Sequence, residues 1–204
     1  MARSNLRDAI LDLAIDVIDE HGEQAIRTNK IAADAGTTPP TLYHYFGSRE
    51  GLIEEAQAER FARSIAVDVG GLVERLSTAV TRDDVRAAIV ELFHQRDTVE
   101  RESARFDRVN ALGAAFARPS LARRISEITN DLASRTAAAL APFQRQGLIR
   151  QDIDLRAVAA WYTSSSLGKA LVTLEGSDID IAQWERTMND AVLHVVFGDC
   201  QTGD

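Results

Sequence analysis

Apolar side chains recur at helical spacing along almost the whole chain, and this periodicity limits the possible folds more than any other feature of the sequence. In the first segment the apolar residues follow the order i, i+4, i+7, i+8, i+11, i+12, which places them on one face of a helix. These residues are Leu6, Ile10, Leu13, Ala14, Val17 and Ile18. The 4 prolines and 12 glycines are few, and most of them punctuate such stretches; no segment reads as a run of strands. The sequence therefore predicts an all-α protein.

Glycines and hydroxyl residues divide the chain into short helices first and longer helices later. The first helix is expected to end near His21, and Thr28 to be the N-cap of a second. A third helix is expected to start after Thr38 and to end by Phe46, and Ser48 would then cap a fourth. The longer amphipathic helices are expected at approximately 60–77, 82–97, 100–117, 119–146, 154–175 and 180–197.

Composition and charge narrow the possible functions. With 204 residues the chain has room for one domain or two small ones. Its net charge of −8 argues against a protein whose whole surface binds polyanions, so any contact with nucleic acid must be local. Cys200 is the only cysteine, which excludes an intrachain disulfide and a cysteine-rich metal site. We expect neither export nor a membrane span, and therefore a cytoplasmic protein.

Residues 28–46 contain the segment that carries chemistry. A two-turn helix, a glycine-containing turn and a second short helix follow one another there, which is the arrangement that lets a helix enter a DNA major groove about 12 Å wide. The string AGTTPPTLYHYF, from Ala35 to Phe46, places hydroxyls, an imidazole and two phenols on one short helix. Leu42 and Phe46 are four residues apart, so they can face the core while the polar side chains face outward or flank it.

This segment resembles the DNA-binding domain of TetR-family transcriptional repressors. The similarity runs from Ile10 to about Ala56 and rests on Gly22, Thr28, Ile31-Ala32, Ala35-Gly36, Thr41-Leu42-Tyr43-His44-Tyr45-Phe46 and Ser48-Arg49-Glu50-Gly51-Leu52. The resemblance implies an N-terminal three-helix helix-turn-helix domain (1–47) and a C-terminal helical bundle for ligand binding and dimerisation (48–204), with the fourth helix shared. About nine to ten helices are expected in all. The implied function is that of a regulator, a repressor, that binds palindromic operator DNA as a homodimer and is released by a small-molecule effector.

The resemblance also implies which residues meet DNA. Hydroxyls beside the unpaired N–H groups of helix starts would hold phosphates, and side chains of the third helix would contact phosphates or bases. The residues so predicted are Thr28, Thr38, Pro39, Pro40, Thr41, Tyr43, His44, Tyr45 and Arg49. Pro39 stands where many relatives have a polar or basic side chain, so contact with a thymine methyl replaces a hydrogen bond there, or no base is read.

The charges of the N-terminal region allow only a local contact with DNA. Residues 1–60 carry six basic and 11 acidic side chains, a net charge of −5. Residues 27–49 reverse this balance, with three basic side chains against one acidic one. We expect Arg3 and Arg7 to extend this face as an N-terminal arm. Because exposed charges farther apart than about 8 Å are largely screened at physiological salt, the local balance decides.

The predicted helices 154–175 and 180–197 have apolar faces that can pair across a two-fold axis into a four-helix interface. By the resemblance they form the dimer, and the alternative is that they belong to the core of a monomer. The residues expected at the interface are Trp161, Leu167, Leu171, Trp184, Met188, Val192 and Val195.

A ligand pocket in the second region should be mostly apolar with a few polar anchors. The candidate residues are Phe93, His94, Phe106, Asn110, Phe116, Trp161, Tyr162 and Ser165. Arg101, Arg105 and Arg108 occur together with acidic residues, and we expect them to form a solvated, ion-paired face.

Two other classes of function stay open from the sequence. A di-iron enzyme built on a helical bundle needs Glu-x-x-His pairs on two helices, and Glu91 with His94 supplies one such pair without a second. The other alternative is a helical protein-interaction module that does not bind DNA. His44 has no metal-ligating side chain at i+3 or i+4, so we predict no metal site and no catalytic residue there. We also expect no cofactor, and we do not expect an enzyme.

Overall fold

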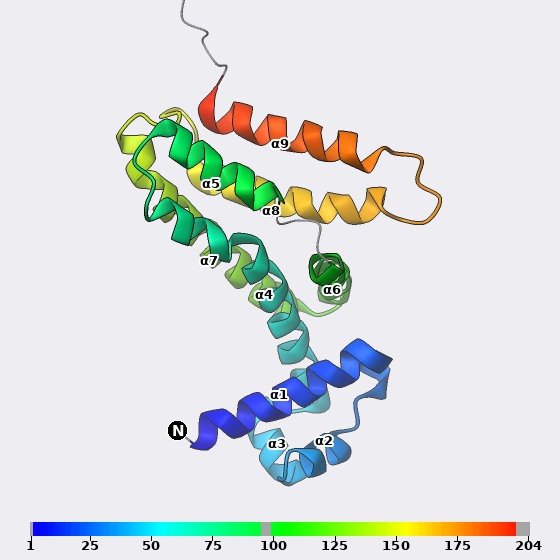
Figure 1. Ribbon diagram of the computed structural model, residues 1–204. Helices are drawn as coiled ribbons and strands as arrows, with labels where there is room; N and C mark the ends of the chain where they lie inside the picture. Colours follow the sequence, from blue (N-terminus) through cyan, green and yellow to red (C-terminus); the bar gives the residue numbers. More distant parts are fainter. Residues whose placement is uncertain (1, 95–98, 199–204) are drawn as a thin grey trace, which may run out of the picture. The chain divides into compact units, whose positions relative to one another are not determined.

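Helices make up all the regular structure of the described chain, as the periodicity predicts. The computed structural model of the protein describes residues 2–94 and 99–198, and over these residues it contains nine α-helices, one 3-10 helix and no strand (Figure 1). Cys200 lies outside the described residues. None of the described helices combines the length and the apolar composition that crossing a bilayer requires.

The first elements meet at glycine turns. They are α1 (Ala2–His21), the 3-10 helix η1 (Glu23–Ala25), α2 (Thr28–Asp34) and α3 (Pro39–Phe46). Gly36 follows α2 with φ of 67°, and Gly47 follows α3 with φ of 74°; residues with a Cβ rarely adopt such angles. These elements and the start of the next helix share one apolar core, formed by Ile10, Leu11, Ala14, Ile15, Ile18, Ile26, Ile31, Ala32, Leu42, Phe46, Leu52, Ile53 and Ala56.

The later helices are mostly longer. They are α4 (Arg49–Leu76), α5 (Arg82–His94), α6 (Val99–Ala115), α7 (Pro119–Arg145), α8 (Leu155–Val172) and α9 (Ile181–Phe197). The Ser48 hydroxyl accepts a hydrogen bond from the Gly51 N–H at 3.0 Å and so caps α4 as predicted. The expectation that a new helix begins near residue 60 is wrong: α4 continues, because residues 52–69 contain neither glycine nor proline.

Two compact units divide the chain. The head unit consists of Met1–Ala62 and Asn110–Ile125, and the body unit consists of Arg63–Val109 and Ser126–Asp204. α4, α6 and α7 each contribute residues to both units. The head unit thus extends past residue 47, where the resemblance places the domain boundary, and includes a second segment around the α6–α7 turn.

In the body unit, α8 and α9 lie side by side because the turn between them folds the chain back (Figure 1). Five helices contribute to the apolar core of this unit, with Leu72, Leu76, Val85, Ile89, Leu92, Leu132, Leu140, Leu155, Ala159, Val192 and Val196 among the buried side chains. Any cavity in this core is therefore lined by several helices at once.

Candidate nucleic-acid interface

α3 is anchored by its apolar residues and begins with residues that suit a helix start. Thr38 occupies the N-cap position, and Pro39 and Pro40 fill the first two helical positions, where a missing N–H breaks no intrahelical hydrogen bond. Leu42 and Phe46 are buried in the head core, as predicted. The helix is therefore held from one side, and its other side is left for contacts.

The remaining side chains of α3 form a polar face. Tyr43 is 41% exposed, and Pro40 and His44 are also exposed. Thr41 and Tyr45 are half-buried at the edge of this face. Hydroxyl, phenol and imidazole groups of this kind suit contacts with phosphate oxygens and base edges.

Two pairs of hydroxyls tie this face together. The Thr28 hydroxyl lies 2.9 Å from the Tyr43 hydroxyl, and the hydroxyls of Thr38 and Thr41 are 3.1 Å apart. The prediction that Thr28 is the N-cap of α2 is wrong, because Arg27 occupies that position and the Thr28 hydroxyl bonds to the phenol instead. A hydroxyl has one donor and two acceptor sites, so each of these groups keeps the capacity for another hydrogen bond.

Arg49 is engaged within the head unit. Its Nε donates to the Ile26 carbonyl at 3.2 Å, its Nη2 to the Glu23 carbonyl at 2.9 Å, and its Nη1 to the Glu50 carboxylate at 3.0 Å. The guanidinium therefore satisfies backbone carbonyls around η1. These bonds use three of its five N–H groups, so a contact between Arg49 and DNA does not require any of them to break.

Arg7 is likewise used inside the head unit, so the expectation that it extends an N-terminal arm is wrong. Its Nη2 donates to the Glu55 carboxylate at 2.7 Å, and its guanidinium lies over the Phe46 ring, 5.3 Å from the centroid. This places the charge between α1, α3 and α4. The side chain of Arg3, the other residue of the expected arm, lies outside the described part of the chain.

A cluster of polar contacts around Glu23 joins three segments of the head unit. Arg118, which follows α6, donates to the two Glu23 carboxylate oxygens at 3.0 and 2.7 Å, and Gln57 of α4 donates to one of them at 2.7 Å. Burial raises the pKa of Glu23, but these hydrogen bonds and the charges of Arg118 and Arg49 outweigh it and hold the pKa below its ordinary value of 4.5. Arg118 and Glu23 are 95 residues apart in sequence, so no local pattern predicts their contact.

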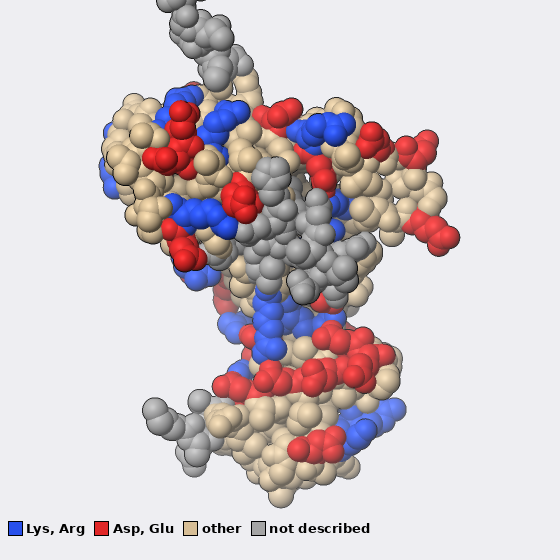
Figure 2. All heavy atoms as spheres, viewed as in Figure 1, with Lys and Arg blue, Asp and Glu red and all other residues tan. Residues whose placement is uncertain are grey.

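Acidic side chains dominate α1 and are scarce on α3. In Figure 2 a band of Asp and Glu covers the surface over α1, whereas the surface over α3 carries few charged groups. The exposed acidic residues of α1 are Asp8, Asp12, Asp16, Asp19 and Glu20. Because carboxylates repel phosphates, this distribution favours contact with nucleic acid on the side of α2 and α3, where Lys30 is exposed.

Of the predicted ligand residues, Tyr162 lies at a cavity in the body unit and Phe93 packs against it. Tyr162 lines this cavity. Phe93 is buried against Tyr162, with ring centroids 5.9 Å apart. Trp161 is 39% exposed, and Ser165 donates its hydroxyl to the Tyr162 carbonyl at 2.6 Å. The aliphatic side chains that form most of the lining have no signal in the sequence beyond that of any core residue.

Phe106, Asn110 and Phe116 do not line this cavity. Phe106 is exposed, and Asn110 and Phe116 belong to the head unit, where Phe116 is 94% exposed. His94 ends α5, and its side chain lies outside the described part of the chain. Aromatic character therefore predicts position poorly here, because an aromatic residue looks the same in sequence whether it packs inside or stands at the surface.

The residues predicted for a dimer interface differ in exposure. Leu171 of α8 is 72% exposed, and Trp161 is partly exposed. Val192 is buried and lines the cavity of its own chain, so its side chain offers no surface to a partner. The half-buried members are Leu167, Trp184, Met188 and Val195.

Three basic side chains of the body unit are buried. From the sequence, two of them were expected at the surface and the third was given no position. Arg108 is 1% exposed, Arg105 is also buried, and the expectation of a solvated face is wrong for both. Lys169 of α8 is buried and pairs with Glu185 of α9. Alternation of charges does not show which face of a helix packs inward, and long side chains can be covered along their stems. The side chain of Arg101 lies outside the described part.

Comparison with known proteins identifies the N-terminal segment. Residues 10–56 match the sequence model of the family described as "Bacterial regulatory proteins, tetR family". The HTH-type transcriptional regulator BetI of Rhizobium meliloti is 43% identical over 47 residues, which is 23% of each chain. The chain spans about a quarter of the length of the curated relatives that it matches first.

Solved structures share the fold over nearly the whole chain. A Rhodococcus sp. protein assigned to the TetR family of transcriptional regulators is 24% identical, with a TM-score of 0.67 over 94% of this chain and 98% of that one. A Saccharomonospora viridis protein assigned as a transcriptional regulator, crystallised in complex with choline, is 20% identical, with a TM-score of 0.61 over 95% and 98%. At these identities the likeness shows the fold.

Proposed function

We infer that this protein, which belongs through residues 10–56 to the tetR family of bacterial regulatory proteins, binds operator DNA and regulates transcription. Its proposed active form is a homodimer that represses transcription and leaves the operator when a small-molecule effector binds the body unit. The family consists of regulators, which agrees with the expectation that the chain is not an enzyme.

The observation that carries this proposal is the two-sided character of α3. Leu42 and Phe46 fix the helix to the head core, while Tyr43 and His44 are exposed with their polar groups outward. A helix held in this way can enter the major groove without refolding, and its hydroxyls and imidazole then reach phosphates and base edges. We assign Tyr43 and Thr28 to phosphate contact, because their hydrogen-bonded hydroxyls form a single polar site.

Neutral groups supply most of the proposed DNA contacts. Arg49 donates to backbone carbonyls, and Arg27 does the same toward the carbonyls of Gln24 and Ile26. Lys30 is then the cation best placed to neutralise a phosphate. If one Lys30 acts in each protomer, about two counterions are released, and the slope of log K against log salt concentration is about −2.

Exposed apolar side chains on α8 support the proposed homodimer. Leu171 and Trp161 are exposed there, and burying them against a second copy of the helix would remove apolar surface from water. A homodimer of this kind would bind two half-sites about 34–36 Å apart, or at a multiple of that spacing, so the operator is expected to be an inverted repeat.

The fold neighbour that holds choline supports a small-molecule effector for this chain. An effector can shift the DNA affinity only by the difference between its affinities for the two states, typically about 1–3 kcal/mol. The DNA affinity is therefore expected to fall about 5- to 150-fold on effector binding.

Selection of bound sequences from a pool of random duplexes tests the proposal. Wild-type protein is expected to enrich an inverted repeat whose half-sites are 10–10.5 base pairs apart, or a multiple of this. Tyr43→Ala is the matched variant, and it should enrich the same repeat more weakly while keeping the wild-type melting temperature. A wild-type pool without enrichment would contradict DNA binding and favour the protein-interaction module.

A further inference from the structure

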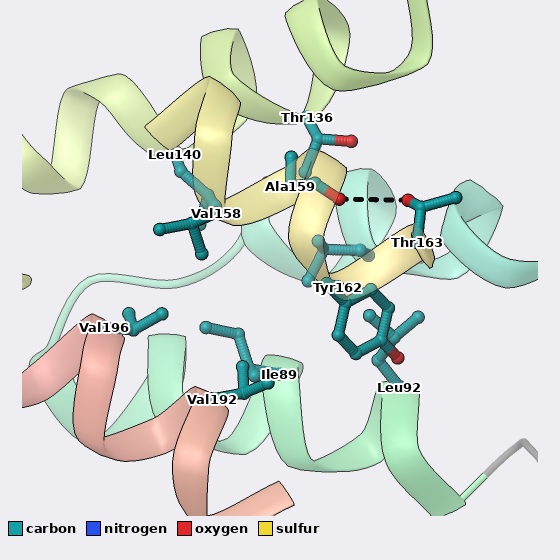
Figure 3. A pocket seen from close by; sticks show the side chains of 11 residues that line it. Ile89, Leu92, Thr136, Leu140, Val158, Ala159, Tyr162, Thr163, Val192 and Val196 are labelled. Atoms are coloured by element: carbon teal, nitrogen blue, oxygen red, sulfur yellow. Dashed lines mark hydrogen bonds between the residues drawn. The ribbon is translucent and has the colours of Figure 1, made fainter. Parts of the chain in front are cut away.

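An apolar cavity lies inside the body unit, between five helices. Its walls come from α4, α5, α7, α8 and α9, and its volume is about 40 Å³. Figure 3 shows Ile89, Val192 and Val196 on one side, with Leu140 and Val158 opposite. These walls are side chains from separate helices.

The lining is mostly aliphatic, and none of the described residues that form it is charged. Its hydroxyls belong to Thr136, Tyr162 and Thr163. Thr163 donates its hydroxyl to the Ala159 carbonyl at 3.0 Å, as drawn in Figure 3. Apolar ligand atoms can be buried against such a wall, and one neutral polar group can be hydrogen-bonded there. An ionised group would be buried without a charged partner, which costs free energy.

We propose that this cavity binds an uncharged, mostly apolar ligand with a single hydroxyl or carbonyl group, and that this ligand is the effector. The effector role rests on the proposed function, whereas the binding itself does not. The chemistry of the wall excludes carboxylates and ammonium ions from the interior. The ligand class therefore differs from that of the choline-bound neighbour.

The cavity is smaller than the proposed ligand, and this difference would couple ligand binding to a change in the body unit. An apolar cavity of about 150 Å³ accommodates a benzene-sized molecule, which is several times the space present here. A ligand of six or more carbon atoms binds only a state in which the walls have separated, and this differential affinity is what shifts the two populations.

Calorimetric titration of the full chain with three matched probes tests the ligand class. The probes are 1-hexanol, hexanoate and hexyltrimethylammonium, with 1-butanol and 1-octanol to extend the alcohol series. We expect the alcohols to bind, with Kd falling about fourfold for each added methylene group. Hexanoate and hexyltrimethylammonium should bind at least about tenfold more weakly than hexanol. Equal binding of the ionic probes, or no binding of any alcohol, would overturn the proposal.

Two variants locate the bound alcohol. Ala159→Leu fills the cavity and should abolish hexanol binding, whereas Ala157→Leu, on the exposed side of the same helix, should leave the Kd unchanged. If Ala159→Leu does not fold, Leu140→Ala serves, because the larger cavity should lower the octanol Kd at least about fivefold. Unchanged alcohol affinities in the folded cavity variant would place the site elsewhere and refute the assignment.

The outcome separates this inference from the proposed function. Alcohol binding is measured without DNA, and duplex selection is measured without alcohol. Enrichment of an operator together with absent alcohol binding removes the ligand assignment alone. Alcohol binding without an enriched duplex removes the proposed regulator and leaves the binding site.

Discussion

The two units of the molecule expose opposite kinds of side chain. In the head unit, α3 exposes Tyr43 and His44 over a buried apolar base. In the body unit, α8 exposes Leu171 while Lys169 two residues earlier is buried. Both helices bury one side, but their exposed sides suit different partners. Exposed polar groups favour a polyanionic partner, and exposed apolar groups favour a protein surface.

This contrast shows which features of a sequence identify a partner. A short helix crowded with hydroxyls and rings is unusual enough to be recognised in the sequence, since core packing does not need those groups. An apolar residue on a long helix has no such signature, because burial within the chain and burial against a second chain require the same side chain. The body therefore depends on the structure for its interpretation much more than the head does.

The largest expected effect is on protein stability, from a change to the buried apolar side of α3. Leu42→Ala removes a fully buried side chain, so the free energy of unfolding should fall by about 2–5 kcal/mol. Chemical denaturation measures this change. His44→Ala on the exposed side of the same helix is the control, and its effect should stay within about 0.5 kcal/mol. Similar losses for both variants would show that α3 lacks the two-sided character on which the comparison rests.

The apolar surface of the body is tested next. Leu171→Asp should raise the dimer dissociation constant at least about tenfold, because a carboxylate would be buried in the interface. Sedimentation equilibrium measures the mass. Val80→Asp changes a residue of similar exposure outside α8 and α9 and should leave the dimer intact. A Leu171→Asp protein with the wild-type dissociation constant would remove α8 from the interface.

Tyr43 tests the polar surface of the head. Tyr43→Ala should raise the Kd for the selected operator about tenfold, which corresponds to about 1.4 kcal/mol. Tyr43→Phe keeps the ring but loses the hydroxyl that bonds to Thr28, so its Kd should lie between the other two. Fluorescence anisotropy gives the three values. If Tyr43→Phe matches the wild type, the ring carries the contact and the hydroxyl does not.

Arg49 sharpens the distinction between supporting and contacting residues. Arg49→Ala removes the hydrogen bonds to the Ile26 and Glu23 carbonyls, so the free energy of unfolding should decrease by about 1 kcal/mol. Denaturation and operator binding are measured on the same preparation. A large loss of DNA affinity at unchanged stability would mean that the guanidinium contacts DNA instead.

The smallest effect is expected at Glu23. Its pKa is depressed in the folded protein, so its contribution to stability is complete above pH 4.5 and disappears as the pH falls through the folded pKa. The free energy of unfolding of wild type should exceed that of Glu23→Gln by about 1 kcal/mol at pH 7, and the gap should close toward pH 3. Urea denaturation at both pH values measures it. Glu20→Gln, at an exposed carboxylate, should show no such gap at pH 7.

Most helices could be predicted from the sequence, because period, caps and turns are local properties. The expected stretches at 82–97, 154–175 and 180–197 lie within a few residues of α5, α8 and α9. The polar face of α3 was predictable for the same reason. The positions of Arg7 and Arg108, two side chains expected to face DNA or solvent, were not predictable, because their partners are set by helix packing.

The sequence alone determined the helical class and the group of hydroxyls and rings on α3, since both follow from residues close together in the chain. The tertiary structure decided which arginines bond to groups within the protein, which carboxylate pairs with Arg118, and which aliphatic residues of five helices line a cavity. These are contacts between residues far apart in sequence. They depend on how helix faces pack, and a periodic pattern constrains that packing only to the level of a buried face.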